Sequence, residues 1–260
     1  MSESTTLLCT GHIQPDQAAF PWLDFLSQGT STLLGAVLAF AFGWALYKKQ
    51  KHEENKAYLH YMLSIMCALK NHMYAFKERV AQKRYDEYCQ IQTQIETSIN
   101  NNQPPHIQMR ATANYMYGAE FMMPVDVEKL YFLTSREPNL IVLIGTLIDS
   151  VKSLNHITSD INNDIEKHGW QDGGAKSDRV LLTLEKSKLL YEQLDSAIYL
   201  SELAEMRLLQ FGALEYKRKM KIQKPFEFTD DKYKALKPKP IASWEDGYEW
   251  FPKKKRWWNK

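Results

Sequence analysis

The glycine-rich stretch GWQDGGAKS, at residues 169–177, is the part of the sequence that comes nearest to a catalytic loop. A phosphate-binding loop needs the pattern G-x-x-x-x-G-K-[ST], in which backbone N–H groups surround the phosphates and the Lys side chain reaches them. Gly169 and Gly174 have the required separation, but Lys176 comes one position too late. A strand should precede such a loop, whereas the preceding sequence has helical spacing. We therefore interpret the stretch as a turn between two helices.

Two other patterns contain the residue types of metal ligands without the spacing. In DINND, at residues 160–164, acids and amides alternate as in a calcium loop, but Ile165 stands where the turn needs glycine. On a helix, Asp160 and Asp164 would instead share one solvated face. The seven histidines are scattered, and no pair has the usual spacing of a zinc site. With no nucleophile elbow, H-E-x-x-H or kinase motif present, we expect no catalytic residues, metal or cofactor, and a protein that is not an enzyme.

The C-terminal sequence WEDGYEWFPKKKRWWNK carries a basic cluster between aromatic residues. Cations attract anionic lipid headgroups and Trp prefers the membrane interface, so this tail is a candidate for lying on a membrane surface. A partner protein is a second candidate ligand, and single-stranded nucleic acid, which stacks on aromatic rings, is a third that we do not favour. Alternatively, the tail binds no ligand, and its tryptophans pack on the protein's own core. The candidate binding residues are Trp250, Lys253, Lys254, Lys255, Arg256, Trp257 and Trp258.

A second candidate contact surface lies in an apolar stretch near the N-terminus. Small side chains occur there at every fourth residue, namely Ser31, Gly35, Ala39 and Gly43. Lipid provides no hydrophobic driving force between helices, so close backbone approach through small residues is a main route to their association. We therefore expect this small-residue ridge to mediate self-association, although small residues are also common in membrane helices that do not associate.

The ridge lies within Gly29–Tyr47, a run of 19 residues without a charge. As a helix it is about 28 Å long, close to the hydrocarbon thickness of a bilayer. A cleaved signal peptide would need a basic segment before its apolar core, and a buried soluble helix of this length would usually carry a polar stripe. Trp44 and Tyr47 are followed by Lys48 and Lys49, as is typical where a span meets the membrane interface. We predict an uncleaved transmembrane helix.

The charge distribution predicts its orientation. The net charge of +2 says little by itself, but residues 1–47 contain no Lys or Arg, so all 33 basic residues follow the span. Basic flanks stay in the cytoplasm, which places the N-terminus outside and the remainder inside the cell membrane. Three cysteines without a C-x-x-C motif suit a reducing compartment. The apolar run LIVLIGTLI at 140–148 is too short for a second span, and we assign it to a helix in a soluble core.

Helical spacing of apolar residues continues through the cytoplasmic chain. One stripe comprises Tyr58, Met62, Ile65, Leu69, Met73, Phe76 and Val80. A second comprises Ile144, Leu147, Val151, Leu154, Ile157, Ile161 and Ile165. A third, beginning at Val180, suggests a helix to about residue 221, and Pro124 and Pro138 fit the first turns of helices. No alternating strand pattern is evident, so we predict an all-α protein with an antiparallel helical bundle.

The predicted organisation has four parts: a short extracytoplasmic segment at 1–28, the transmembrane helix at 29–47, the cytoplasmic helical domain at 48–223, and an extended basic and aromatic tail at 224–260. In outline this looks like many small membrane-anchored bacterial proteins, including effectors of defence systems that disturb the membrane. We expect a homo-oligomer of the cell inner membrane that binds a cytoplasmic protein. We expect its function to be that of a membrane-disrupting effector of an antiphage or toxin system, or alternatively that of a scaffold that recruits a cytoplasmic protein or nucleic acid through the tail.

Overall fold

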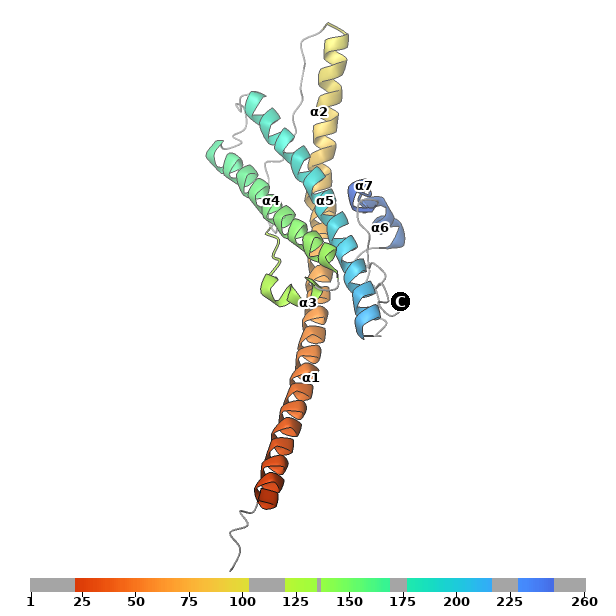
Figure 1. Ribbon diagram of the computed structural model, residues 1–260. Coiled ribbons are helices and arrows are strands. Elements are labelled where there is room, and N and C mark those ends of the chain that lie inside the picture. Colours follow the sequence, from red (N-terminus) through yellow and green to blue (C-terminus); the bar gives the residue numbers. More distant parts are fainter. Residues whose placement is uncertain (1–21, 103–119, 135–136, 169–176, 217–228, 246–260) are drawn as a thin grey trace, which may run out of the picture. The chain divides into compact units, whose positions relative to one another are not determined.

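The computed structural model describes residues 22–102, 120–134, 137–168, 177–216 and 229–245. Every regular element in these ranges is a helix, which confirms the all-α prediction for the described residues (Figure 1). The elements are α1 (Trp22–Phe76), the π-helical η1 (Lys77–Ala81), α2 (Gln82–Asn100), the 3₁₀ helix η2 (Val127–Leu130), α3 (Tyr131–Thr134), α4 (Pro138–His168), α5 (Ser177–Tyr216), α6 (Asp230–Leu236) and α7 (Ala242–Glu245).

The chain divides into two compact units, Met1–Glu53 and Glu54–Lys260, and the division falls inside α1. The described part of the first unit is entirely helical. All side chains from Gly29 to Glu53 in it are exposed. The hydrophobic core therefore belongs to the second unit.

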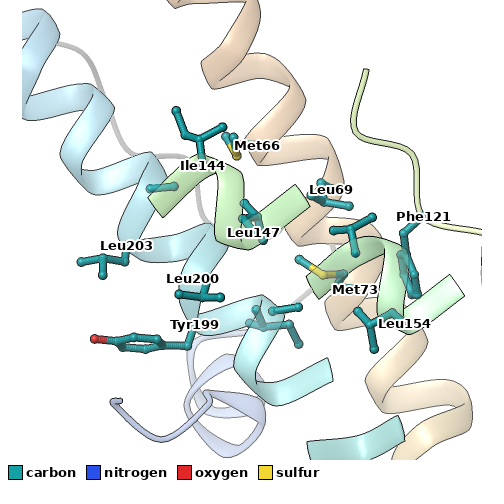
Figure 2. Close-up of a cluster of buried hydrophobic side chains, with 14 of the residues drawn as sticks. Met66, Leu69, Met73, Phe121, Ile144, Leu147, Leu154, Tyr199, Leu200 and Leu203 are labelled. Carbon is teal, nitrogen blue, oxygen red and sulfur yellow. The ribbon is translucent and has the colours of Figure 1, made fainter. Parts of the chain in front are cut away.

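The core of the second unit is formed where the C-terminal part of α1 meets α4 and α5 (Figure 2). The labelled buried side chains are Met66, Leu69 and Met73 from α1, Phe121 from the segment before η2, Ile144, Leu147 and Leu154 from α4, and Tyr199, Leu200 and Leu203 from α5. The apolar residues recur at three and four along each helix, so one stripe of each faces the others. This confirms the two predicted stripes, with Ile65, Ile157, Tyr58 and Val80 at their partly buried margins.

Contacts between side chains show that α5 runs antiparallel to the α1–η1–α2 segment. Lys70 and Tyr74 contact Glu205 and Glu202 respectively, and Gln82 accepts a hydrogen bond from the Tyr191 hydroxyl at 2.9 Å. Residue numbers thus fall along α5 as they rise along the facing segment. The π-helical stretch lies between these contacts, and α2 ends at Asn100.

The segment before η2 differs from the prediction, because Pro124 does not begin a helix. The backbone of Asp126 both accepts a hydrogen bond from the Tyr58 hydroxyl at 2.9 Å and donates one back to it at 3.1 Å. The Asp126 side chain then caps the following turn by accepting from the N–H of Glu128. The contact with Tyr58 of α1 positions the capping residue Asp126, so η2 begins at Val127, three residues after Pro124. By contrast, α4 does begin at Pro138, as predicted.

The C-terminal region is also more ordered than an extended tail. The predicted extended form holds for residues 237–240, which are not helical, but it is wrong for α6 and α7. The Thr229 side chain caps α6, and Leu236 is buried in the core. Tyr233, Ile241 and Trp244 pack against the same core. These short helices form because tertiary contacts stabilise them. The prolines and lysines of the local sequence do not predict those contacts.

Replacing Leu147 by Ala is expected to lower the free energy of unfolding by about 2–5 kcal/mol, because it leaves a cavity in the fully buried stripe of α4. Val142→Ala is the matched control on the same helix, since Val142 is about half exposed and should cost well under 1 kcal/mol. Urea unfolding of the full chain in detergent, followed by circular dichroism, measures both. Equal losses in the two variants would contradict the assigned core face.

Candidate functional site

The apolar stretch of α1 has no covering contacts within its own unit. The exposed fractions are 67% for Leu33, 76% for Phe40 and 68% for Phe42. Isolated exposed apolar residues are normal, but soluble monomers rarely expose a continuous apolar surface of this kind, and such surfaces mark membrane or protein contacts. The stretch is therefore the first candidate functional site.

At the C-terminal end of this stretch, two lysines contact two aromatic rings. The Lys48 ammonium lies 3.6 Å from the centroid of the Trp44 ring, and that of Lys51 lies 5.9 Å from the Tyr47 ring. The helix places each lysine one turn after its aromatic partner. An amphipathic ring beneath a cation is the arrangement that suits the boundary between hydrocarbon and water.

The four small residues predicted to mediate association, Ser31, Gly35, Ala39 and Gly43, all lie on α1 in this stretch. A Cβ atom placed on Gly35 or Gly43 would meet no other atom within 4 Å. Each step of four residues turns about 40° beyond one full turn, so the ridge winds slowly around the helix. Its backbone is thus open to close approach along the whole ridge.

Among the described residues, two helices are long and apolar enough to cross a membrane. One is the helix that begins in the stretch just described, and none of its most apolar window is buried. The other lies in α4, where a third of the window is buried. Buried residues of α4 belong to the same core as those of α1 and α5 (Figure 2).

The second candidate site is a buried polar seam between the α1–η1 segment and α5, which sequence reasoning missed. We define the polar seam as Lys70, Tyr74, Lys77, Asp195, Glu202 and Glu205. Lys70 pairs with Glu205 and Lys77 with Asp195, and each lysine is only 2% exposed. A buried ammonium is stable only when it is paired and hydrogen-bonded, so these contacts fix which residues of the two helices face each other.

Lys77 connects α5 with α6. Besides pairing with Asp195, its ammonium donates to the carbonyl oxygen of Leu236 at 2.8 Å, at the C-terminal end of α6. It also lies 5.1 Å from the centroid of the Tyr191 ring, which is stacked on Tyr85. Lys77 is the first residue of η1, and π-helical turns are frequent at functional sites because they redirect side chains.

Two phenols share one carboxylate in the seam. The Tyr74 hydroxyl donates to Glu202 at 2.9 Å, and the Tyr233 hydroxyl of α6 donates to the same oxygen. Burial, and then the adjacent carboxylate, raise the pKa of Tyr74 well above its usual value, and burial also raises the pKa of Tyr233. Both phenols therefore remain protonated donors at physiological pH, and Glu202 serves as their common acceptor.

A signal for the seam was present in the sequence. Lys70 and Lys77 lie seven residues apart beside an apolar stripe, and Glu202 and Glu205 lie within the apolar part of α5. Charged residues at such positions usually have buried partners. The pairing itself could not be derived, because it depends on how α5 is aligned with a helix more than one hundred residues away in sequence.

The remaining predicted sites have separate outcomes. Asp160 lies 3.7 Å from His156, while Asp164 pairs with Lys186 of α5, so the two acids contact different partners. No group of three or more potential metal ligands occurs within the part of the chain that the structure describes. The glycine-rich stretch from 169 to 176 and the basic aromatic residues from Trp250 to Trp258 lie outside the described residues.

Removing one partner of the Lys70–Glu205 pair tests the seam. Glu205→Leu is expected to lower the free energy of unfolding by about 3–5 kcal/mol, since it leaves a buried ammonium without its carboxylate. The double variant Lys70→Met with Glu205→Leu should regain most of this loss. Glu192→Leu is the control, because Glu192 pairs with Lys188 on the surface at 3.9 Å and should cost under about 1 kcal/mol. If the effects of Lys70→Met and of Glu205→Leu, each measured alone, add up to the effect of the double variant, the pair is not coupled.

Comparison of the chain with protein-family models, with curated proteins and with solved structures finds no match.

Proposed function

We propose that this protein is a non-enzymatic, single-pass protein of the cell inner membrane that self-associates through its membrane helix and binds a partner through a cytoplasmic antiparallel helical bundle. The observation that carries the proposal is the uncharged stretch Gly29–Tyr47, whose side chains are all exposed. A lipid bilayer removes this surface from water, and a helix satisfies its own backbone hydrogen bonds there.

The orientation of the membrane helix follows from its flanks. Lys48, Lys49 and Lys51 follow the apolar stretch, whereas no basic residue precedes it in the sequence. The cation–aromatic contacts at Trp44 and Tyr47 anchor this end of the helix at an interface. The basic end is therefore cytoplasmic, and the bundle that follows it is cytoplasmic as well.

The small-residue ridge supports self-association. A Cβ atom added at Gly35 or Gly43 would meet no side chain within 4 Å, so these positions leave room for a second helix to approach. Membrane helices gain contact energy mainly from such close packing.

The biological role that we propose is that of an effector which disturbs the membrane when it assembles, as in bacterial antiphage or toxin systems. An assembly of membrane helices is the physical basis of this role. The alternative is a scaffold in which assembled copies hold a cytoplasmic protein, with the basic aromatic tail as the recruiting element. Nucleic acid remains a less favoured ligand of that tail.

Topology is tested by reporter fusions to both ends of the full chain. We expect an alkaline phosphatase fusion to be active at the N-terminus only, and a fluorescent cytoplasmic reporter to be active at the C-terminus only. The chain should stay in the membrane fraction after alkaline carbonate extraction, because its anchor is buried in hydrocarbon. Release into the soluble fraction, or an external C-terminus, would overturn the assignment.

Self-association is tested by placing larger side chains on the small-residue ridge. Gly35→Leu with Gly43→Leu is expected to reduce cross-linked oligomer in membranes at least tenfold, because leucine keeps the backbones apart. The matched control, Val37→Leu with Ala41→Leu, adds apolar bulk to the other side of the same helix and should leave the oligomer intact. Unchanged oligomer in the ridge variant would exclude this surface.

The same two variants separate the effector from the scaffold. For an effector, overproduction of the wild-type chain arrests growth and admits a membrane-impermeant dye, and only the ridge variant abolishes both effects. For a scaffold, neither chain is toxic, and a cytoplasmic protein that co-purifies with the wild type is lost when residues 246–260 are deleted. Toxicity that persists in a monomeric ridge variant would contradict assembly as the cause.

A further inference from the structure

The C-terminal segment Thr229–Trp244 occupies a defined place on the second unit. It contains α6, the non-helical residues 237–240 and the start of α7, and α6 lies beside α5 (Figure 1). A helix of seven residues is not stable by itself in water, since nucleation costs more than so few hydrogen bonds return. The helical form of α6 therefore depends on the surface that holds it.

Three polar contacts hold α6, and each uses a different chemical group. The Lys77 ammonium binds the Leu236 carbonyl, which the end of a helix leaves without an intrahelical partner. The Glu202 carboxylate accepts from the Tyr233 hydroxyl. The Glu78 carboxylate pairs with Lys232.

Apolar contacts complete the surface. Leu236 is buried, and the Tyr233 ring lies 5.4 Å from that of Tyr74. Ile241 and Trp244, which follow α6, are partly buried against the same core. The surface is thus specific for a short helix that carries a lysine, then a tyrosine, and an apolar residue three positions later at its C-terminal end.

Two of the polar groups that hold the segment, Lys77 and Glu202, have other partners within the second unit. Lys77 retains Asp195, and Glu202 retains the Tyr74 hydroxyl, when the segment is taken away. Release of the segment therefore leaves Lys77 and Glu202 each in contact with a group of the core. The contacts are strong enough to select one segment, yet their loss does not dismantle the core behind them.

We propose that Thr229–Trp244 is a releasable latch, and that the surface formed by Tyr74, Lys77, Glu78 and Glu202 is a helix-docking site whose resident occupant is this latch. The site favours the latch because both belong to one chain, which keeps its effective concentration high. Release exposes the docking site and frees the latch sequence, which the basic and aromatic residues from Trp250 to Trp258 follow in the chain. The inference is independent of the proposed membrane function, because it rests only on contacts within the second unit.

The first test measures the latch in the wild-type, full-length chain. Hydrogen exchange followed by mass spectrometry should show the amides of α6 exchanging at least tenfold faster than those of residues 195–205 in α5, because α6 opens locally. If both sets exchange at one common rate, the segment opens only when the whole unit unfolds, and the latch is refuted.

The second test measures the docking site with a fluorescent synthetic peptide of residues 229–245. Tyr233→Ala with Leu236→Ala weakens the resident latch, so the peptide should bind this full-length variant at least tenfold more tightly than it binds the wild type. The control, Lys234→Ala with Lys237→Ala, changes exposed residues of the same segment and should behave as the wild type. Adding Glu202→Gln to the weakened variant should reduce peptide binding about tenfold, because it replaces the charged acceptor of Tyr233.

Circular dichroism melting of each variant accompanies the binding measurement. Absence of peptide binding to a weakened variant that melts like the wild type would overturn the docking site, as would equal binding to the wild type and the weakened variant. If the weakened variant does not fold, the hydrogen-exchange comparison in the wild type decides the proposal by itself.

Discussion

The second unit depends on one constraint, which is that a buried ammonium group must find its partners inside the protein. Lys70 and Lys77 lie within the interface of α1 and η1 with α5, at positions where helices usually place apolar residues. Apolar side chains tolerate several alignments of two packed helices, whereas a lysine–carboxylate pair tolerates one. The seam thus selects the alignment in which Glu205 faces Lys70 and Asp195 faces Lys77.

That alignment has consequences beyond the two pairs. With α5 in place, Glu202 receives the hydroxyls of Tyr74 and Tyr233, and Lys77 can reach the Leu236 carbonyl. The C-terminal segment is thereby attached to groups that already belong to the core. A modest number of polar contacts thus accounts both for the order of the helices and for the place of a segment that has little helical tendency of its own.

The two most apolar helices of the chain illustrate how similar sequences serve different purposes. In α4, residues of the apolar stripe are buried in the core that α1 and α5 also form. In Gly29–Tyr47, apolar side chains surround the helix and none is covered. Both helices are long and apolar enough to cross a membrane. They differ in burial, since a third of the most apolar window is buried in α4 and none of it is buried in the other helix.

The sequence by itself determined the all-α class, the positions of the long helices and the inward stripes of α1 and α4, because the spacing of apolar residues follows from the helical repeat. It also determined the uncharged stretch and the charge asymmetry around it, since both are matters of composition along the chain. These properties are local, because each can be recognised in a stretch of sequence that covers only a few helical turns.

Only the tertiary structure decided the start of η2 at Val127, the helices in the C-terminal region and the polar seam. Tyr58 fixes the backbone of Asp126 across 68 residues, and Lys77 fixes Leu236 across 159. In both cases the local sequence permits several conformations, and the free energy that selects one comes from a group far away in the chain. Such selection becomes visible only when the two segments are brought together, because neither carries a sign of its partner in its own sequence.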